Sequence, residues 1–427
     1  MQGSRGRGPR GRGGPPRSDA EESLEELAAL AESAGAEIAG KAVQYREAPE
    51  AATLIGRGKA GELRDLAAAS GSGLVIFDRE LTPTQLRNLE RELECRVIDR
   101  TQLILDIFAR RARTREGQLQ VELAQLNYLM PRLTGRGVEM SRLAGGIGAR
   151  GPGETQLETD RRRIFRRIAK IREQLERVRA TRGVQRKQRR AVPLATAALV
   201  GYTNAGKSSL FNRLTGAQVV ADARLFATLD PTVRPVRLPS NRKVLLSDTV
   251  GFIRNLPTTL VKAFRATLEE VAEAALILHV VDVSSPQGIP HAAHVLQVLE
   301  EIGAAQTPRL LVLNKIDLLA GLDSAPSGGG DGVAADWPER QGERRVPVSA
   351  RTGEGIEQLL EALDAALPVD PVARACFVFP FGAESQLHSV HEFGKVLETC
   401  YRETGVWVEA EVPESLLRAL QPYLATR

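Results

Sequence analysis

The sequence predicts an α/β protein whose largest domain is built on a mostly parallel sheet. Three observations lead to this fold class. Five short apolar runs alternate with helical stretches between residues 193 and 369, a glycine-rich loop follows the first run, and two long amphipathic stretches precede it. Parallel strands covered on both faces have continuous apolar sequences, and each is joined to the next by a crossover, usually a helix. A chain of 427 residues has room for about two to four domains.

The overall composition is that of a soluble globular chain. Hydrophobic residues make up 42 % and charged residues 26 %, which argues against a collagen, a fully disordered chain or a membrane bundle. No apolar run approaches the roughly 18 residues that a bilayer-spanning helix needs, and the first residues lack the apolar core of a secretory signal. We therefore expect a cytoplasmic protein with no membrane span. Cys95, Cys376 and Cys400 are too widely separated to indicate a disulfide framework or a zinc ribbon.

The chain begins with a basic segment and a small α/β pattern. Residues 1–17 contain five Arg and no acidic residue, so we expect a disordered Arg/Gly-rich tail. Residues 18–100 alternate helical patterns at 21–32, 59–69 and 82–93 with the apolar runs GLVIFD and CRVID. This alternation predicts an N-terminal α/β subdomain.

A helical hairpin is predicted over residues 101–192. Residues 101–133 carry a broad apolar stripe typical of one long helix, and a second helical pattern runs from about 155 to 190. The segment LAGGIGARGPGET between them forms the expected tip. Its glycines allow close backbone approach to a ligand, with a plain flexible loop as the alternative.

The second helix of this hairpin is strongly basic. Residues 161–190 contain fourteen Lys or Arg against Glu173 and Glu176. Such a block favours a polyanionic partner, RNA first, although a solvated helix face is the alternative. The RNA-binding candidates on the tip and the helix are Arg142, Gly146, Arg150, Gly153, Arg161, Arg162, Arg163, Arg166 and Arg167.

The five apolar runs of residues 193–369 are TAALVG, KVLLSD, ALILHVVD, RLLVLN and RVPVSA. Ligands of such sheets bind beyond the carboxyl ends of the strands. The Gly/Ser-rich stretch 321–342 interrupts the last crossover, and we expect a surface loop without a catalytic role. From residue 370 to 427, the run CFVFPF, a helical pattern at 386–401, the extended run GVWVEAEV and a terminal helix predict a small α+β domain.

A phosphate-binding loop is the strongest chemical signal. GYTNAGKSS matches G-x-x-x-x-G-K-S, with Gly201, Gly206, Lys207 and Ser208 at the fixed positions, after a strand and before a helical stretch. Backbone N–H groups and a helix N-terminus surround the phosphates in such a loop. The lysine supplies positive charge to the β- and γ-phosphates, and the serine hydroxyl binds Mg²⁺.

Later strand ends supply the remaining parts of a guanine-nucleotide switch. Asp248 of DTVG can hold Mg²⁺ through water, and the Gly251 N–H can meet the γ-phosphate. Thr228 of FATLDPT can bind Mg²⁺ when a γ-phosphate is present. Asp317 of NKID can accept hydrogen bonds from guanine N1–H and N2–H, donors that adenine lacks there. The Asn314 side chain joins neighbouring loops.

The guanine base is expected to meet two further groups. The stem of Lys315 covers the base, and Ser349 and Ala350 bring a backbone N–H to guanine O6.

One position argues against fast intrinsic hydrolysis. Many such switches carry a Gln after the DxxG glycine, whereas this chain carries Phe252, which has no hydrogen-bonding group. We hypothesise that Asn204 in the phosphate loop holds a K⁺ ion beside the phosphates. The pairs His291/His294 and His388/His391 have helical spacing but no obvious third ligand, so packing or surface roles are expected.

The motifs GGIGARGPGETQLETDRR, GYTNAGKSSL, FATLDPT, DTVGF and NKID resemble those of the HflX family of ribosome-associated GTPases, over nearly the whole chain from about Ser18. The resemblance implies a P-loop GTPase domain, Mg²⁺-dependent hydrolysis of GTP to GDP, and binding to the large ribosomal subunit and its rRNA. It also implies dissociation of stalled or idle ribosomes into subunits under stress. A GTP-regulated assembly or RNA-maturation factor is the alternative. We expect a monomer.

The site residues follow from the matched motifs. Lys207, Thr228 and Gly251 are the expected catalytic residues, and Ser208, Thr228 and, through water, Asp248 the expected Mg²⁺ ligands. The expected GTP-binding residues are Gly201, Tyr202, Thr203, Asn204, Ala205, Gly206, Lys207, Ser208, Ser209, Phe226, Ala227, Thr228, Leu229, Asp230, Asp248, Thr249, Val250, Gly251, Asn314, Lys315, Ile316, Asp317, Val348, Ser349 and Ala350.

Overall fold

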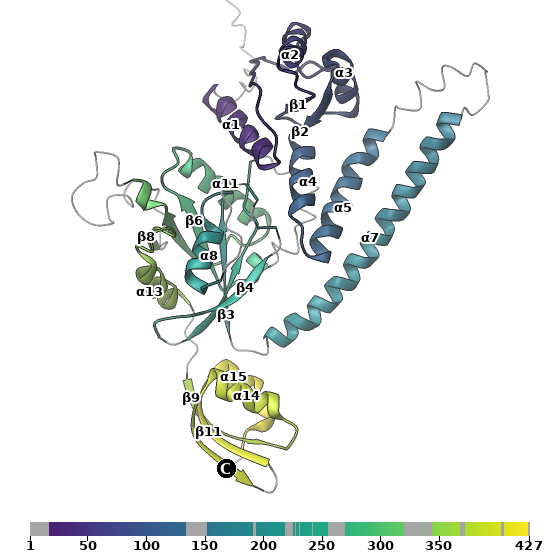
Figure 1. Ribbon diagram of the computed structural model, residues 1–427. Helices are drawn as coiled ribbons and strands as arrows, with labels where there is room; N and C mark the ends of the chain where they lie inside the picture. Colours follow the sequence, from purple (N-terminus) through teal and green to yellow (C-terminus); the bar gives the residue numbers. More distant parts are fainter. Residues whose placement is uncertain are drawn as a thin grey trace, which may run out of the picture. The chain divides into compact units, whose positions relative to one another are not determined.

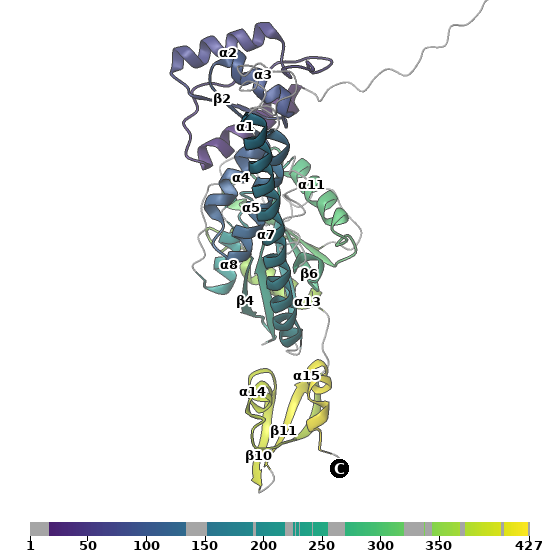
Figure 2. The same ribbon diagram turned by 90° about the vertical axis from the view of Figure 1, so that its right-hand side faces the viewer.

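The computed structural model describes residues 17–133, 152–190, 194–217, 225–226, 228–229, 231–240, 242–254, 270–319, 337, 344–367, 372–402 and 405–425. The chain divides into two compact units. The first comprises Met1–Ile171, Asp222–Phe226 and Asn255–Ala263, and the second comprises Arg172–Ala221, Ala227–Arg254 and Phe264–Arg427. The elements of both units are drawn in Figures 1 and 2. Residues 1–16 of the basic tail and 143–151 of the glycine-rich tip lie outside the described residues, whereas Gly153 of the tip lies in the helix Pro152–Arg190.

A two-stranded parallel sheet and its helices form the start of the first unit, where the sequence predicts an α/β pattern. The elements are α1 (Arg17–Ser33), α2 (Arg57–Ser70), β1 (Leu74–Phe77), α3 (Pro83–Leu93) and β2 (Arg96–Asp99), with Leu74 paired to Arg96. Helix α3 begins with a capping box, in which Thr82 Oγ1 accepts from Gln85 N and the Gln85 side chain accepts from Thr82 N. Leu89 and Leu93 of α3 are fully buried in the core beneath the sheet.

The single long helix predicted over 101–133 is wrong. The segment forms α4 (Arg100–Arg111), α5 (Arg115–Leu129) and the 3₁₀ turn η1 (Met130–Leu133). Ala112 has extended backbone after α4, and Thr114 starts a new helix by accepting a hydrogen bond from Gly117 N at 3.0 Å. Apolar spacing continues through the break because both helices bury a face. The periodicity alone therefore missed a break that capping decides.

Helix α7 (Pro152–Arg190) confirms the second helical stretch. Within the first unit it lies beside α5 (Figures 1 and 2), and Arg167 donates two hydrogen bonds to the Glu122 carboxylate. Ile168 and Ile171 of α7 are buried. The antiparallel pair expected from the sequence is therefore made by α5 and α7, without α4.

The second unit contains a six-stranded sheet of order β4-β5-β3-β6-β7-β8. Its strands are β3 (Ala195–Gly201), β4 (Thr232–Arg237), β5 (Lys243–Asp248), β6 (Leu276–Asp282), β7 (Arg309–Asn314) and β8 (Arg344–Val348). All pairs are parallel except β4–β5. The five predicted strands are all present. The sequence missed β4, which carries Pro235 and is an edge strand, the position in a sheet where proline is tolerated.

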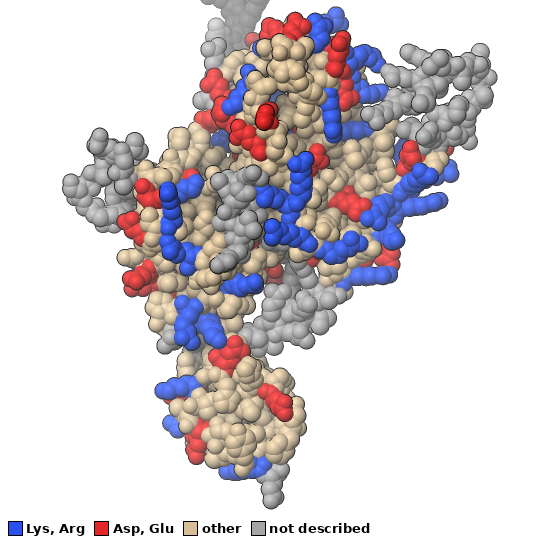
Figure 3. Space-filling view, viewed as in Figure 1, with Lys and Arg blue, Asp and Glu red and all other residues tan. Residues whose placement is uncertain are grey.

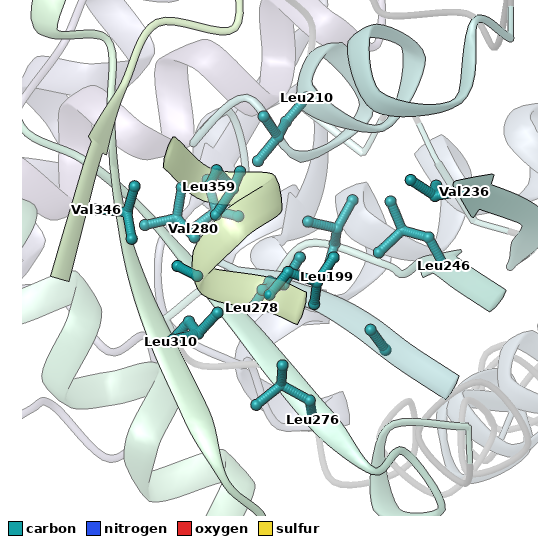
Figure 4. Packing of buried hydrophobic residues seen from close by; sticks show 14 of the residues in the cluster. Leu199, Leu210, Val236, Leu246, Leu276, Leu278, Val280, Leu310, Val346 and Leu359 are labelled. Carbon is teal, nitrogen blue, oxygen red and sulfur yellow. The ribbon is translucent and has the colours of Figure 1, made fainter. Parts of the chain in front are cut away.

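Helices cover both faces of this sheet. Side chains at alternate positions, including Leu199, Leu246 and Leu278, pack under α8 (Lys207–Thr215) and α13 (Ile356–Ala366), as Figure 4 shows. Helix α11 (Gly288–Glu301) covers the opposite face. There Val281, Leu311 and Leu313 form a second cluster. The central strands β3, β6 and β7 therefore bury both of their faces, as their continuous apolar runs predict, whereas β4 and β8 at the edges keep exposed or half-buried residues.

Trp337 corrects the expectation that 321–342 is a surface loop. Its side chain is only 8 % exposed and belongs to the cluster with Val281 and Leu313. A Cβ atom on Gly288, at the start of α11, would lie 3.0 Å from the Trp337 ring, so the indole packs directly against this glycine. The stretch thus contributes a core residue, a role that its Gly/Ser-rich composition hides.

The last elements form an antiparallel sheet of order β10-β11-β9. They are β9 (Val372–Phe379), α14 (Glu384–Phe393), β10 (Lys395–Arg402), β11 (Gly405–Pro413), α15 (Glu414–Ala419) and the 3₁₀ turn η3 (Gln421–Tyr423). The helix predicted over 386–401 is wrong in its second half. Helix α14 ends at Phe393, Gly394 has extended backbone, and the following residues pair with β11. Their β-branched and aromatic side chains favour a strand.

Within the described part of the chain, no helix combines the length and the apolar character needed to cross a membrane.

Candidate nucleotide-binding site

The phosphate-binding loop connects β3 to α8. Gly206 has φ +92, and a Cβ atom there would lie 2.2 Å from Asn314 Nδ2. At Gly201 a Cβ atom would lie 2.2 Å from the Val280 carbonyl oxygen. Both glycines are therefore required by close packing, as well as by the backbone angle at Gly206. Asn204 is exposed, also with positive φ, so the loop presents its amide outward.

Lys207 lies inside this loop. Its side chain is buried, and Nζ donates to the carbonyl oxygens of Gly201 (3.1 Å) and Tyr202 (2.7 Å). Burial lowers the pKa of Lys207 to about 8, and the nearby Asp248 carboxylate opposes that shift. The ammonium is thus held by the loop at the position from which it can contact a phosphate.

Three oxygen-bearing side chains meet beside Lys207. Ser208 Oγ lies 2.8 Å from Thr228 Oγ1, and both hydroxyls donate to Asp248 Oδ2, at 2.7 and 2.9 Å. Asp248 is fully buried, and burial raises the pKa of its carboxyl, against the opposing effect of these hydrogen bonds. Its second oxygen, Oδ1, is buried with no hydrogen-bond partner.

These residues fit a Mg²⁺ ion. Two hydroxyls and a buried carboxylate oxygen are hard donors of the kind that Mg²⁺ prefers. An orphaned carboxylate oxygen in the protein interior is costly unless a cation or water satisfies it. When bound, Mg²⁺ would neutralise charge on the β- and γ-phosphates. Among the described residues no group of three or more His, Cys, Asp or Glu side chains is placed to hold a metal. A Mg²⁺ ion beside Asp248 would therefore use the hydroxyls of Ser208 and Thr228 as ligands.

The DTVG segment lies against the phosphate loop. Thr203 N donates to Phe252 O at 2.7 Å, and Phe252 N donates to Gly201 O at 3.1 Å. A Cβ atom on Gly251 would lie 2.9 Å from Thr203 Cα and 3.0 Å from Lys207 Nζ. The Phe252 side chain is 3 % exposed. Its backbone is therefore what this residue presents to the site.

Loops after β7 and β8 carry the residues that the sequence predicts to bind guanine. Asn314 Nδ2 donates to Ala205 O at 2.8 Å, and its Oδ1 accepts from Ala350 N at 3.0 Å. Ser349 Oγ donates to Asp317 Oδ1 at 2.7 Å. Asn314 thus joins the phosphate loop to the loop of Ser349 and Ala350, as expected from the sequence. Ser349 and Ala350 were expected to bring a backbone N–H to guanine O6, but both N–H groups donate within the protein, Ser349 N to Glu354 O at 2.9 Å and Ala350 N to Asn314 Oδ1.

Two side chains that the sequence analysis missed support these loops. Asp282, at the end of β6, accepts a hydrogen bond from Lys315 Nζ at 2.6 Å. Arg213 of α8 donates to the carbonyl oxygens of Ala350 and Arg351, at 3.4 and 2.6 Å. The sequence could have indicated Asp282, because it is the last residue of a predicted strand, as Asp248 and Asn314 are.

Other predicted residues lie apart from this group. Ala227, Asp230, Arg142, Gly146 and Arg150 are outside the described residues. Phe226 is 2 % exposed and packs edge-on against Phe108, with ring centroids 4.5 Å apart, in the first unit. The predicted arginines of α7, Arg161, Arg162, Arg163, Arg166 and Arg167, also belong to the first unit. Those at positions 162 and 163 expose 70 % and 74 % of their side chains, and Figure 3 shows Lys and Arg gathered along this helix.

Comparison with known proteins gives the same assignment along the chain. Residues 21–109 match the model of a GTP-binding GTPase N-terminal domain, residues 111–189 that of a GTP-binding GTPase middle region, and residues 196–315 that of a 50S ribosome-binding GTPase. GTPase HflX of Caldanaerobacter subterraneus subsp. tengcongensis is 47 % identical over 404 residues, covering 95 % of this chain and 90 % of that protein.

The chain belongs to the HflX family of GTPases. GTPase HflX of Escherichia coli (strain K12) is 50 % identical over 346 residues, 81 % of this chain and 79 % of that protein. Among solved structures, a GTP-binding protein of Sulfolobus solfataricus in complex with GDP is 26 % identical, with 81 % of this chain and 96 % of that chain covered and a TM-score of 0.43. Membership of the HflX family makes this chain a GTPase that hydrolyses GTP to GDP and phosphate.

Proposed function

We propose that this GTPase docks on the large ribosomal subunit in its GTP-bound form, dissociates stalled or idle ribosomes into subunits, and is released after hydrolysis. In this proposal Ser208 and Thr228 bind Mg²⁺, Asp248 binds it through water, and Asp317 with the loop of Ser349 and Ala350 binds guanine. Thr228 and the DTVG segment sense the γ-phosphate.

The contact of Ser208, Thr228 and Asp248 is the observation that carries the switch. The three residues come from the phosphate loop helix, the loop before β4 and the end of β5, yet their oxygen atoms lie within 2.9 Å of one another. One ion bound here would tie all three segments to the γ-phosphate. Loss of that phosphate would release the Thr228 segment, and the protein is expected to leave the large subunit after this change.

The helical pair α5 and α7 supports the ribosomal part of the proposal. Arg162 and Arg163 each have one neighbouring carboxylate, at 3.6 and 3.5 Å, and are otherwise solvated. Exposed guanidinium groups along one helix suit phosphate contacts to structured RNA. Trp337 and Trp407 lie elsewhere in the chain, so base stacking on tryptophan is not part of this surface. We propose residues 101–192, with their Gly-rich tip, as the rRNA-binding arm.

The experiment that tests this function is a sedimentation assay with intact ribosomes. With a non-hydrolysable GTP analogue, the protein should move ribosomes toward free subunits, and with GDP it should not. An assembly or RNA-maturation factor, the alternative function, would instead sediment mainly with immature particles. Equal retention of the GDP and analogue forms on large subunits would contradict the switch.

Charge reversal tests the arm separately. Replacing Arg162 and Arg163 by Glu should weaken large-subunit binding by about tenfold or more and lower its salt dependence, with GTP turnover in the absence of ribosomes unchanged. The matched control replaces Arg374 and Arg418, two exposed arginines near the C-terminus that also have carboxylate partners. Equal loss in both pairs would assign the effect to net charge alone.

A second measurement concerns stimulation and K⁺. GTP turnover should rise by tenfold or more when purified large subunits are added, since Phe252 has no group to orient water. Turnover that is equal in Na⁺ and K⁺ would count against the K⁺ ion proposed at Asn204.

A further inference from the structure

One side chain of the phosphate loop points away from the nucleotide side of the loop. The Tyr202 ring stacks on the ring of His291 in α11, with centroids 3.7 Å apart and planes 7° from parallel. His294, one helical turn further on, meets the same ring edge-on at 6.4 Å. Tyr202 is 7 % exposed. Its ring therefore connects the phosphate loop to α11.

The same three side chains hold the backbone that follows DTVG. Tyr202 Oη accepts a hydrogen bond from Arg254 N at 2.8 Å. His294 Nε2 lies 3.1 Å from Ile253 O. A carbonyl oxygen only accepts, so Nε2 must carry the proton in this contact. Together with the two backbone bonds of Phe252, three consecutive residues of this segment are bound to the phosphate loop or to α11.

The position of this segment matters because its side chain at 252 cannot act on water. What the segment offers the reaction is backbone, chiefly that of Gly251, where a Cβ atom would lie 3.0 Å from Lys207 Nζ. The hydrogen bonds at 252, 253 and 254 fix where that backbone lies. We propose that Tyr202, His291 and His294 are positioning residues for GTP hydrolysis, which hold the segment 252–254 at the distance from the phosphate loop that the reaction needs. All the residues concerned belong to the second unit.

This inference concerns the GTPase step itself and does not depend on docking to the ribosome. It also accounts for the His291/His294 pair, which the sequence assigned to packing or a surface. Both imidazoles contact the Tyr202 ring, and His294 also contacts the backbone oxygen of Ile253. Their effect on the rate must therefore pass through the Tyr202 ring and this backbone.

The test is single-turnover GTP hydrolysis by the full chain, without ribosomes, together with GDP affinity. Tyr202→Phe keeps the ring and removes the acceptor for Arg254 N. His294→Ala removes the donor to Ile253 O. Each should lower the hydrolysis rate about three- to tenfold, the effect of one net hydrogen bond, while GTP and GDP affinities stay within about twofold. His388→Ala, from the exposed histidine pair of α14, is the control and should leave the rate unchanged.

Substitutions at His291 test whether the ring stacked on Tyr202 supports the hydrolysis rate. His291→Ala should lower the rate, and His291→Phe should restore it to within about twofold because the stack on Tyr202 is retained. Emission from Trp337, which packs at the start of α11, can be followed in a Trp407→Phe background because the chain has two tryptophans. It should not shift in any of these variants.

Three results would overturn the proposal. The first is an unchanged rate in Tyr202→Phe and His294→Ala. The second is a faster rate, because the contacts would then restrain the segment rather than position it. The third is a loss of rate accompanied by an equal loss of nucleotide affinity and a shifted Trp337 emission. That result would indicate that α11 has been displaced from the sheet.

Discussion

Replacing Asp317 by Asn should exchange guanine for xanthine specificity. Asp317 Oδ1 accepts from Ser349 Oγ at 2.7 Å, and Ser349 Oγ itself accepts from Thr352 N at 3.1 Å. The Ser349 hydroxyl hydrogen is therefore directed at Asp317. In the Asn variant the amide oxygen takes the place of Oδ1 to accept that hydrogen, so the amide nitrogen faces the base.

The expected magnitude follows from the bonds exchanged. Guanine presents N1–H and N2–H to the carboxylate, and an amide nitrogen there opposes one of these donors. A hydrogen bond to a charged group contributes about 1.5–3 kcal/mol, so GTP affinity should fall roughly 10- to 150-fold. Xanthine carries an acceptor in place of the 2-amino group, and its triphosphate should gain a comparable factor. The ratio of the two affinities should then invert.

The assay is competition of GTP and xanthosine triphosphate against a fluorescent guanine nucleotide, for the natural chain and for Asp317→Asn. Adding Ser349→Ala to Asp317→Asn should reduce the difference between the affinities for xanthosine triphosphate and GTP, because the Asn amide loses the hydroxyl that orients it. Retained preference for GTP in Asp317→Asn, with the chain folded, would remove Asp317 from the base site and refute the reasoning.

Three further predictions follow. Ser208→Ala removes one proposed Mg²⁺ ligand, so the Mg²⁺ concentration at half-maximal GTP binding should rise about tenfold or more. An unchanged Mg²⁺ titration would contradict the assignment. Burial, with Arg254 next to it, lowers the pKa of His291 to about 4. The folded chain therefore favours the neutral ring, and stability should be full above about pH 6.5 and fall toward pH 4, by about 1–2 kcal/mol after allowance for solvent screening. Urea unfolding at pH 7 and pH 5 should show this fall in the natural chain and a smaller one in His291→Phe, and equal falls would argue against it. Trp337→Ala should cost about 2–4 kcal/mol of stability by the same method because a buried ring leaves a cavity, whereas a change below about 0.5 kcal/mol would show that the indole is dispensable.

The predicted strands of the parallel sheet are confirmed because their signal is local and strong. The central runs of β3, β6 and β7 are buried on both faces, so hydrophobicity marks them without knowledge of their neighbours. The edge strand β4 was missed for the opposite reason. It carries Pro235 and two arginines, and it is a strand because Val233 and Val236 pair with Ser247 and Val244 of β5.

Breaks within long amphipathic stretches were also missed. Nothing in the apolar spacing of 101–133 distinguishes one helix from two. The second helix begins where it does because the Thr114 side chain caps α5. At 386–401 the strand β10 forms because β11 offers it a partner. Pairing and capping energies of this kind depend on groups distant in the sequence or on backbone angles, so the apolar period does not carry them.

The sequence by itself determined which residues are chemically able to bind phosphate, Mg²⁺ and guanine, since the motifs fix residue type and order. Only the tertiary structure decided which atoms meet. It brings Ser208, Thr228 and Asp248 into one oxygen cluster with an unpartnered carboxylate oxygen. It also places Trp337 in a core cluster and stacks the Tyr202 ring on His291 of α11. The physical reason is that spacing along the chain defines chemistry within a loop, whereas contacts between loops depend on how the buried sheet aligns the ends of its strands.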